Sequence, residues 1–87
     1  MNNPSFIKSE YKKYKYMYGD ALMLFRRGDF YFAYEDDAVT ISQLLHINRW
    51  INPAGGHKET MFPFHSLEVY LPKMVRAGYR VLIFGAD

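Results

Sequence analysis

The chain has 87 residues and a formal net charge of only +2, which predicts one small domain over residues 1–87. It has no cysteine, which excludes disulfides, thiolate zinc sites and a thiol nucleophile. Apolar residues make up 49% of the chain and charged residues 23%, which excludes an intrinsically disordered protein.

The N-terminal part of the chain predicts a helix. Asn3 and Pro4 are typical of an N-cap and a first helical position, so a helix is expected over residues 4–17, ending at Gly19. The inward positions at helical spacing are Ile7, Tyr11, Tyr14 and Tyr18, with a basic stripe of Lys8, Lys12 and Lys15 beside them.

A hairpin is predicted next. Residues 21–26 are apolar on both faces, which indicates an interior strand. The turn Arg27-Gly28-Asp29 leads into a second strand from Phe30 to Tyr34. Glu35, Asp36 and Asp37 then open a second helix, where carboxylates meet the positive end of the helix dipole. Its expected inward side chains are Ala38, Ile41, Leu44 and Leu45, with Asn48 as a further candidate.

The remaining elements alternate between strand and helix. Residues 47–51 predict a third strand, residues 52–59 a loop, and residues 60–64 a further extended run. Ser66 is the expected N-cap of a last helix that contains Pro72, ends at Gly78 and buries Leu67, Tyr70, Leu71 and Met74. Residues 79–84 predict a final strand. This order predicts an α/β (α+β) fold in which a small mixed β-sheet is flanked by about three helices.

The aromatic stretch at residues 25–38, FRRGDFYFAYEDDA, allows two interpretations. Residues two apart in a strand point the same way, so Phe30 and Phe32 are predicted to share one side. They are either part of the core or a stacking surface for bases. Likewise, Arg26, Arg27, Lys12 and Lys15 either contact phosphates or form a solvated face.

No arrangement of residues indicates catalysis. The acids at 29 and 35–37 could suggest a two-metal site, but a turn and the start of a helix account for them better. His46, His57 and His65 lack the spacing of metal ligands. We therefore expect a non-enzymatic protein with no metal or cofactor. No phosphate-binding glycine loop is present, so ATP-independent action is expected.

A family resemblance rests chiefly on the stretch FRRGDFY at residues 25–31. The further matching residues are Tyr11, Lys15, Tyr18, Asp20, Leu22, Asp37, Ala38, Ser42, Gln43, Leu44, Leu45, Pro63, His65, Glu68, Tyr70, Leu71, Lys73 and Gly78. With these residues the whole chain resembles the N-terminal mismatch-recognition domain, domain I, of MutS, the bacterial mismatch-repair family.

The resemblance implies a role for Phe30. In that family this phenylalanine stacks as a wedge on a mispaired base, and a glutamate two residues later hydrogen-bonds the same base. Phe32 stands at the glutamate position and cannot make that bond, and Met61 stands where the family usually has a glycine. The candidate DNA-binding residues are Phe30, Phe32, Lys15, Arg26, Arg27 and Lys12.

Two functions are therefore open. The first is a stand-alone module that binds double-stranded DNA, mismatched or distorted DNA included, alongside a larger DNA-processing protein. The alternative is a protein-interaction or dimerisation module, in which the strand edge at Val81 to Phe84 pairs with a partner or a second copy. No apolar run reaches the ~20 residues of a membrane span and the polar start is not a secretory signal, so a cytoplasmic protein without a membrane partner is expected.

Overall fold

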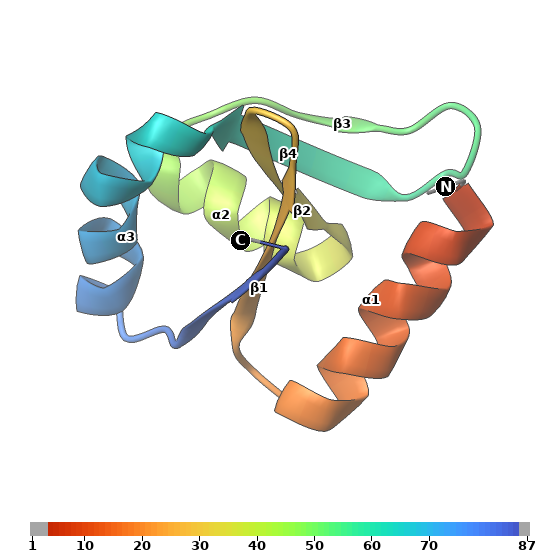
Figure 1. Ribbon diagram of the computed structural model, residues 1–87, viewed down its shortest axis with the longest axis horizontal. Coiled ribbons are helices and arrows are strands. Elements are labelled where there is room, and N and C mark those ends of the chain that lie inside the picture. The colour runs from red at the N-terminus through yellow and green to blue at the C-terminus, as the bar shows by residue number, and fades with distance from the viewer. Residues whose placement is uncertain (1–3, 86–87) are drawn as a thin grey trace.

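A mixed sheet of five strands organises the part of the chain that the structure describes. The computed structural model describes the backbone of residues 4–85 and the side chains of residues 9–85. The elements are α1 (Pro4–Tyr18), β1 (Leu22–Arg27), β2 (Phe30–Tyr34), α2 (Glu35–Leu45), β3 (Arg49–Ile51), β4 (Lys58–Pro63), the 3₁₀ turn η1 (Phe64–Ser66), α3 (Leu67–Arg76) and β5 (Val81–Phe84). The predicted order and the predicted α+β fold class are confirmed within these residues (Figure 1).

The strand order explains why β1 is apolar on both faces. The strands lie in the order β3-β4-β2-β1-β5, antiparallel except for the parallel pair of β1 and β5. β1 is therefore an interior strand, as predicted, and β5 forms one edge of the sheet. Among residues 4–85, no helix is long and apolar enough to cross a membrane.

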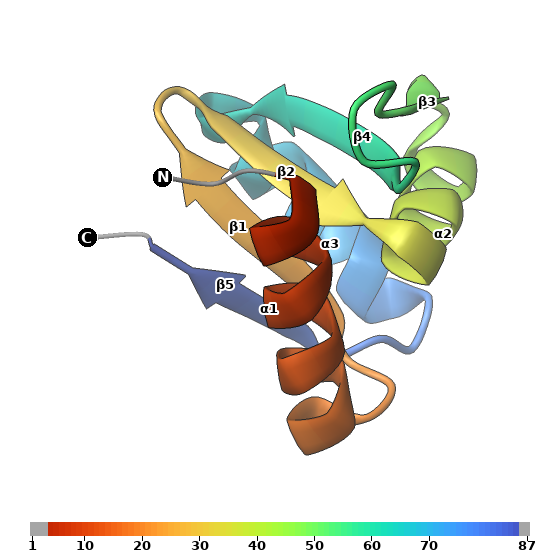
Figure 2. The same ribbon diagram turned by 90° about the vertical axis from the view of Figure 1, so that its right-hand side faces the viewer.

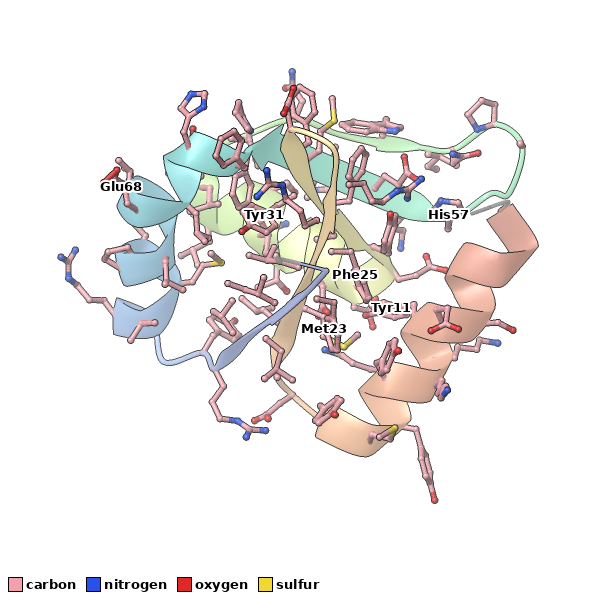
Figure 3. The ribbon with its side chains drawn as sticks, viewed as in Figure 1. Tyr11, Met23, Phe25, Tyr31, His57 and Glu68 are labelled. Atoms are coloured by element: carbon pink, nitrogen blue, oxygen red, sulfur yellow. The ribbon has the colours of Figure 1, made fainter. Side chains whose placement is uncertain are left out.

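Two hydrophobic clusters lie on opposite faces of this sheet. The first lies between the sheet and the helices α2 and α3, and its buried members are Leu22, Leu24, Tyr31, Ala33, Ile41, Leu45, Phe62 and Met74. The second lies on the face that α1 covers, and it consists of Tyr11, Met23 and Tyr34 with Tyr14, Phe25, Phe32 and Phe84 packed against them. Figure 3 shows the sheet nearly edge-on, with Tyr31 on one side and Tyr11, Met23 and Phe25 on the other.

The hairpin between β1 and β2 is a tight turn at Gly28 and Asp29. Gly28 has a φ of +63°, a left-handed conformation that glycine adopts without steric penalty. The backbone N–H of Phe64 donates a hydrogen bond to the carbonyl oxygen of Asp29 at 2.9 Å. The tip of the hairpin is thereby attached to η1, and the start of β2 has a fixed position.

Several details differ from the sequence prediction. The third strand begins at Arg49 instead of residue 47, and Asn48 is exposed beyond the end of α2 at Leu45, so it is not an inward residue of that helix. Ser66 is not an N-cap: it has helical backbone angles and makes no capping hydrogen bond, because η1 continues directly into α3. β4 begins at Lys58, inside the stretch predicted as a loop, because residues 58–60 pair with β3. The last strand begins at Val81 instead of residue 79. The predicted N-cap Asn3 and the side chains of Ile7 and Lys8 lie outside the described residues.

Candidate nucleic-acid interface

The alternation of β2 separates its aromatic side chains between the two faces of the sheet. Tyr31 and Ala33 are buried in the cluster under α2 and α3. Phe32 and Tyr34 belong to the cluster on the α1 face. Phe30 is two residues before Phe32 and so projects to the same face.

Among the aromatic side chains of β2, Phe30 is the one that packs against neither hydrophobic cluster of the described residues. It is half-buried, and its neighbours across the hairpin and on β4 are Arg27 and Pro63. The residue before it, Asp29, is hydrogen-bonded to Phe64, so the backbone that carries the Phe30 ring has a fixed position at the end of the sheet.

Phe32 combines a packed side with an accessible one. Its ring stacks on that of Tyr34 with an interplanar angle of 12° and 6.4 Å between the centroids. The guanidinium carbon of Arg27 lies 4.9 Å from the centroid of the Phe32 ring, and an Nη1 hydrogen of Arg27 is donated to the Tyr34 hydroxyl. Phe32 thus packs against the second cluster, and its ring also contacts the guanidinium group of Arg27.

The two neighbouring arginines lie on opposite faces. Arg27 lies on the α1 face beside Phe30 and Phe32. Arg26 pairs with Tyr31 in register, and its guanidinium carbon lies 4.2 Å from the centroid of the Phe64 ring. The Nε of Arg26 also donates to the carbonyl oxygen of Gly28 at 2.6 Å, which holds this side chain at the hairpin tip.

Lys15 lies in a different environment from the hairpin residues. Its Nζ is 2.7 Å from Oδ1 of Asp37 and donates to the carbonyl oxygen of Ala21 at 2.6 Å. The other carboxylate oxygen of Asp37 accepts the backbone N–H of Met23 at 3.2 Å. Burial raises the pKa of Asp37, and the Lys15 ammonium partly offsets that effect. Lys15 therefore joins α1, β1 and α2, whereas Lys12 is exposed on α1.

The structure thus brings together three of the six candidate residues, namely Arg27, Phe30 and Phe32. Arg26 is at the same hairpin but on the other face, and the ammonium of Lys15 is bound within the protein. Glu35, Asp36 and Asp37 form the first turn of α2, as predicted. Among the side chains described, no three His, Asp or Glu residues are arranged to hold a metal ion.

Sequence reasoning missed Trp50 and Met61, which extend the same face. Met61 of β4 pairs with Phe32, and Trp50 of β3 pairs with Glu59. Both side chains are 37% exposed. The alternation of residues 59–63 could have indicated that Met61 faces outward, but which strand lies beside it depends on a pairing that the sequence does not display.

Comparison with known proteins agrees with the resemblance noted in the sequence. The family described as MutS domain I matches residues 6–86. This chain belongs to the MutS domain I family. The domain I fold therefore carries the hairpin with Phe30, and the stretch FRRGDFY lies within the matched residues.

Three curated relatives show the extent of the similarity. The DNA mismatch repair protein MutS of Flavobacterium psychrophilum is 46% identical over 80 residues, which is 88% of this chain and 9% of the relative. The MutS of Phocaeicola vulgatus is 51% identical over 67 residues, or 74% of this chain and 8% of the relative. The MutS of Thermotoga neapolitana is 42% identical over 80 residues, or 88% of this chain and 9% of the relative. The chain thus spans about a tenth of the length of these proteins.

Two buried tyrosines near this face predict a loss of stability in alkali. Burial raises the pKa of Tyr34, and the positive charge of Arg27 partly offsets that rise. The pKa of Tyr11 is also raised, mainly by burial and to a lesser extent by the negative charge of Asp37. Both contributions to the free energy of unfolding are fully present below about pH 10 and are lost as the pH rises above it, by at most about 1.4 kcal/mol per pH unit for each tyrosine. In urea unfolding between pH 9 and 11, the free energy of unfolding of Tyr11→Phe should decline less steeply with pH than that of the wild type. Tyr16→Phe, at a residue that is 92% exposed, is the control, and an equal decline in all three proteins would contradict the assignment.

Proposed function

We propose that this chain is a cytoplasmic, non-catalytic DNA-binding module that places Phe30 against mismatched or distorted duplex DNA. The observation that supports this proposal is the position of Phe30, half-buried at an anchored hairpin tip beside Arg27 and apart from both hydrophobic clusters. A ring held in this way can enter a base step without any rearrangement of the core.

The energetics favour a site where the stacking of the duplex is already weak. Inserting an apolar wedge costs a few kcal/mol of unstacking per step, and a mismatch or bulge lowers that cost. Arg26 and Arg27 lie at the same end of the sheet, one on each face, where contacts with phosphates would position the protein without reading sequence. The side chain of Phe32 has no hydrogen-bonding atom, so this module would select its site by stacking.

A larger DNA-processing protein is part of the same proposal. The curated relatives are MutS proteins, of which a chain like this one makes up about a tenth. A net charge of only +2 limits the number of phosphates that this chain neutralises by itself. We therefore expect weak binding by the isolated chain and tighter binding when a partner holds the DNA from other sides.

Fluorescence anisotropy tests the proposal directly. Labelled homoduplex, G·T-mismatched, single-base-bulge and single-stranded DNA are titrated at low and moderate salt. We expect salt-sensitive binding that Phe30→Ala weakens by about 5- to 100-fold on the bulged and mismatched duplexes. Tyr16→Ala removes an exposed ring on α1 and should leave the affinities unchanged. Absence of binding at low salt, or equal affinities of Phe30→Ala and the wild type, would refute the proposal.

One observation favours a second candidate, a homodimer or partner complex formed through β5. This strand is an edge of the sheet, and its Ile83 side chain is exposed. The outer backbone groups of an edge strand can pair with another strand. Sedimentation over a range of protein concentrations distinguishes the candidates, because a dimer that Ile83→Lys dissociates would support pairing through β5.

A further inference from the structure

Exposed and half-buried side chains lie next to one another on the α1 face. We call this set the aromatic stripe: Trp50, Met61, Phe32 and Phe30, with Arg27 beside them. Met61 lies opposite Phe32, and Pro63 lies opposite Phe30. Trp50 lies opposite Glu59, which is two residues before Met61 and therefore on the same face. The stripe thus crosses three neighbouring strands, β3, β4 and β2.

Helix α1 covers a different part of this face. Its Tyr14 ring stacks on Phe84 of β5 with centroids 4.6 Å apart and contacts Phe25 of β1 at 6.2 Å. Figure 2 shows α1 lying across the middle of β1 and β2, while β4 and the hairpin extend beyond it. Trp50 and Met61 accordingly keep 37% of their surface exposed.

The chemistry of the stripe matches that of unpaired bases. It offers flat rings and a thioether on an open sheet, the arrangement with which small sheet domains stack two or three bases. Its charge is positive, because Arg27 lies over the Phe32 ring. The carboxylate of Glu59, on the same face, is buried and accepts hydrogen bonds from Trp50 Nε1 at 2.9 Å and Asn52 Nδ2 at 3.5 Å. A phosphate chain following stacked bases would meet Arg27, whereas the exposed acid Asp29 lies in the hairpin turn.

We propose that the aromatic stripe binds single-stranded DNA, with unpaired bases stacked on Trp50, Phe32 and Phe30. The inference rests on the proposed DNA-binding function and extends it from a single wedge residue to a platform of several bases. Stacking of this kind accepts any base, because every base has a flat face. Single-stranded DNA is therefore the preferred ligand, ahead of intact duplex.

The chain supplies its own reporter, since Trp50 is its only tryptophan. The intrinsic fluorescence of the full chain is titrated with unlabelled dT12, with a 12-base-pair homoduplex and with the same duplex carrying a one-base bulge, at low salt. We expect dT12 to quench Trp50 strongly, the bulged duplex less, and the homoduplex least. Quenching by the bulged duplex alone would mean that only extruded bases are bound, which would overturn the preference for single strands.

A negative charge introduced on the aromatic stripe tests whether the single-stranded DNA lies there. Met61→Glu introduces a carboxylate at an exposed site beside Phe32, whereas Val69→Glu makes the same change on α3, at a site that is 57% exposed. We expect Met61→Glu to weaken dT12 binding about tenfold more than Val69→Glu does. Phe32→Leu should weaken it by about 5- to 100-fold, the range for one stacked base.

The two proposals fail in different ways. If labelled duplex binds and Phe30→Ala weakens it, but dT12 does not quench Trp50, the DNA-binding function stands and the stripe proposal is overturned. Equal effects of Met61→Glu and Val69→Glu on dT12 binding would likewise overturn it. If no DNA of any form binds at low salt, both proposals are refuted.

Discussion

Replacing Lys15 with methionine is expected to lower the free energy of unfolding at pH 7 by about 3 kcal/mol. The Lys15 ammonium is 2.7 Å from Asp37, whose side chain is only 4% exposed, so the substitution leaves a buried carboxylate without its counterion. The value is at the lower end for buried pairs, because the Lys15 side chain keeps 27% of its surface and solvent screens part of the interaction.

The loss of stability in Lys15→Met should depend on pH, in a direction set by the pKa of Asp37. Burial already raises the pKa of Asp37 in the wild type, and Lys15 is the main influence that lowers it. Without Lys15 the pKa rises further, and a group with a raised pKa in the folded state favours folding below its ordinary pKa and loses that contribution as the pH increases. The difference between Lys15→Met and the wild type should therefore shrink from pH 7 toward pH 4.

Urea unfolding at pH 4, 5, 6 and 7 measures this effect. Lys13→Met is the matched control, because Lys13 is exposed on the same helix and its loss should change stability by no more than about 0.5 kcal/mol. A deficit that is independent of pH, or equal to that of Lys13→Met, would mean that the ion pair does not carry the stability assigned to it. Lys15 would then be available for the phosphate contact that its charge suggested.

Local signals were sufficient for most of the fold. The strand Phe30–Tyr34 has the predicted bounds and the helix that follows it has the predicted start, because a glycine turn and three successive acids mark them in the sequence. The end of the loop before β4 was not predictable in the same way. Residues 58 and 59 are charged, and they join the sheet because both pair with β3 and Glu59 also pairs with Tyr34 of β2.

The candidate site was harder to predict, since it depends on which side chains share a face. Arg26 and Arg27 look equivalent in the sequence, yet the alternation of β1 places them on opposite faces. Lys15 was selected for its charge, but its partner Asp37 is 22 residues away and becomes its neighbour only through folding. Trp50 and Met61 join the face of Phe30 through pairing between strands, which no local pattern records.

Replacing Glu59 with alanine is expected to lower the free energy of unfolding by about 2–4 kcal/mol. Glu59 is buried and contacts the Nε2 atom of His57 at 2.7 Å while it accepts a hydrogen bond from Trp50 Nε1. His57 is fully buried, and its Nδ1 atom has no hydrogen-bond partner within the described residues. Without Glu59 neither ring nitrogen of His57 would be satisfied, and Trp50 would lose the bond that orients its indole.

Two further substitutions distinguish the loss of the Glu59 hydrogen bonds from the general effect of a substitution in β4. Glu59→Gln keeps one acceptor oxygen and should cost about half as much as Glu59→Ala, whereas the exposed neighbour Lys58 should tolerate alanine within about 0.5 kcal/mol. Urea unfolding followed by Trp50 fluorescence gives the stabilities, and the emission maximum of each folded variant reports the environment of the indole. If Glu59→Ala were as mild as Lys58→Ala, the carboxylate would not be holding Trp50. In that case the part of the stripe on β3 would have no fixed ring for a base to stack on.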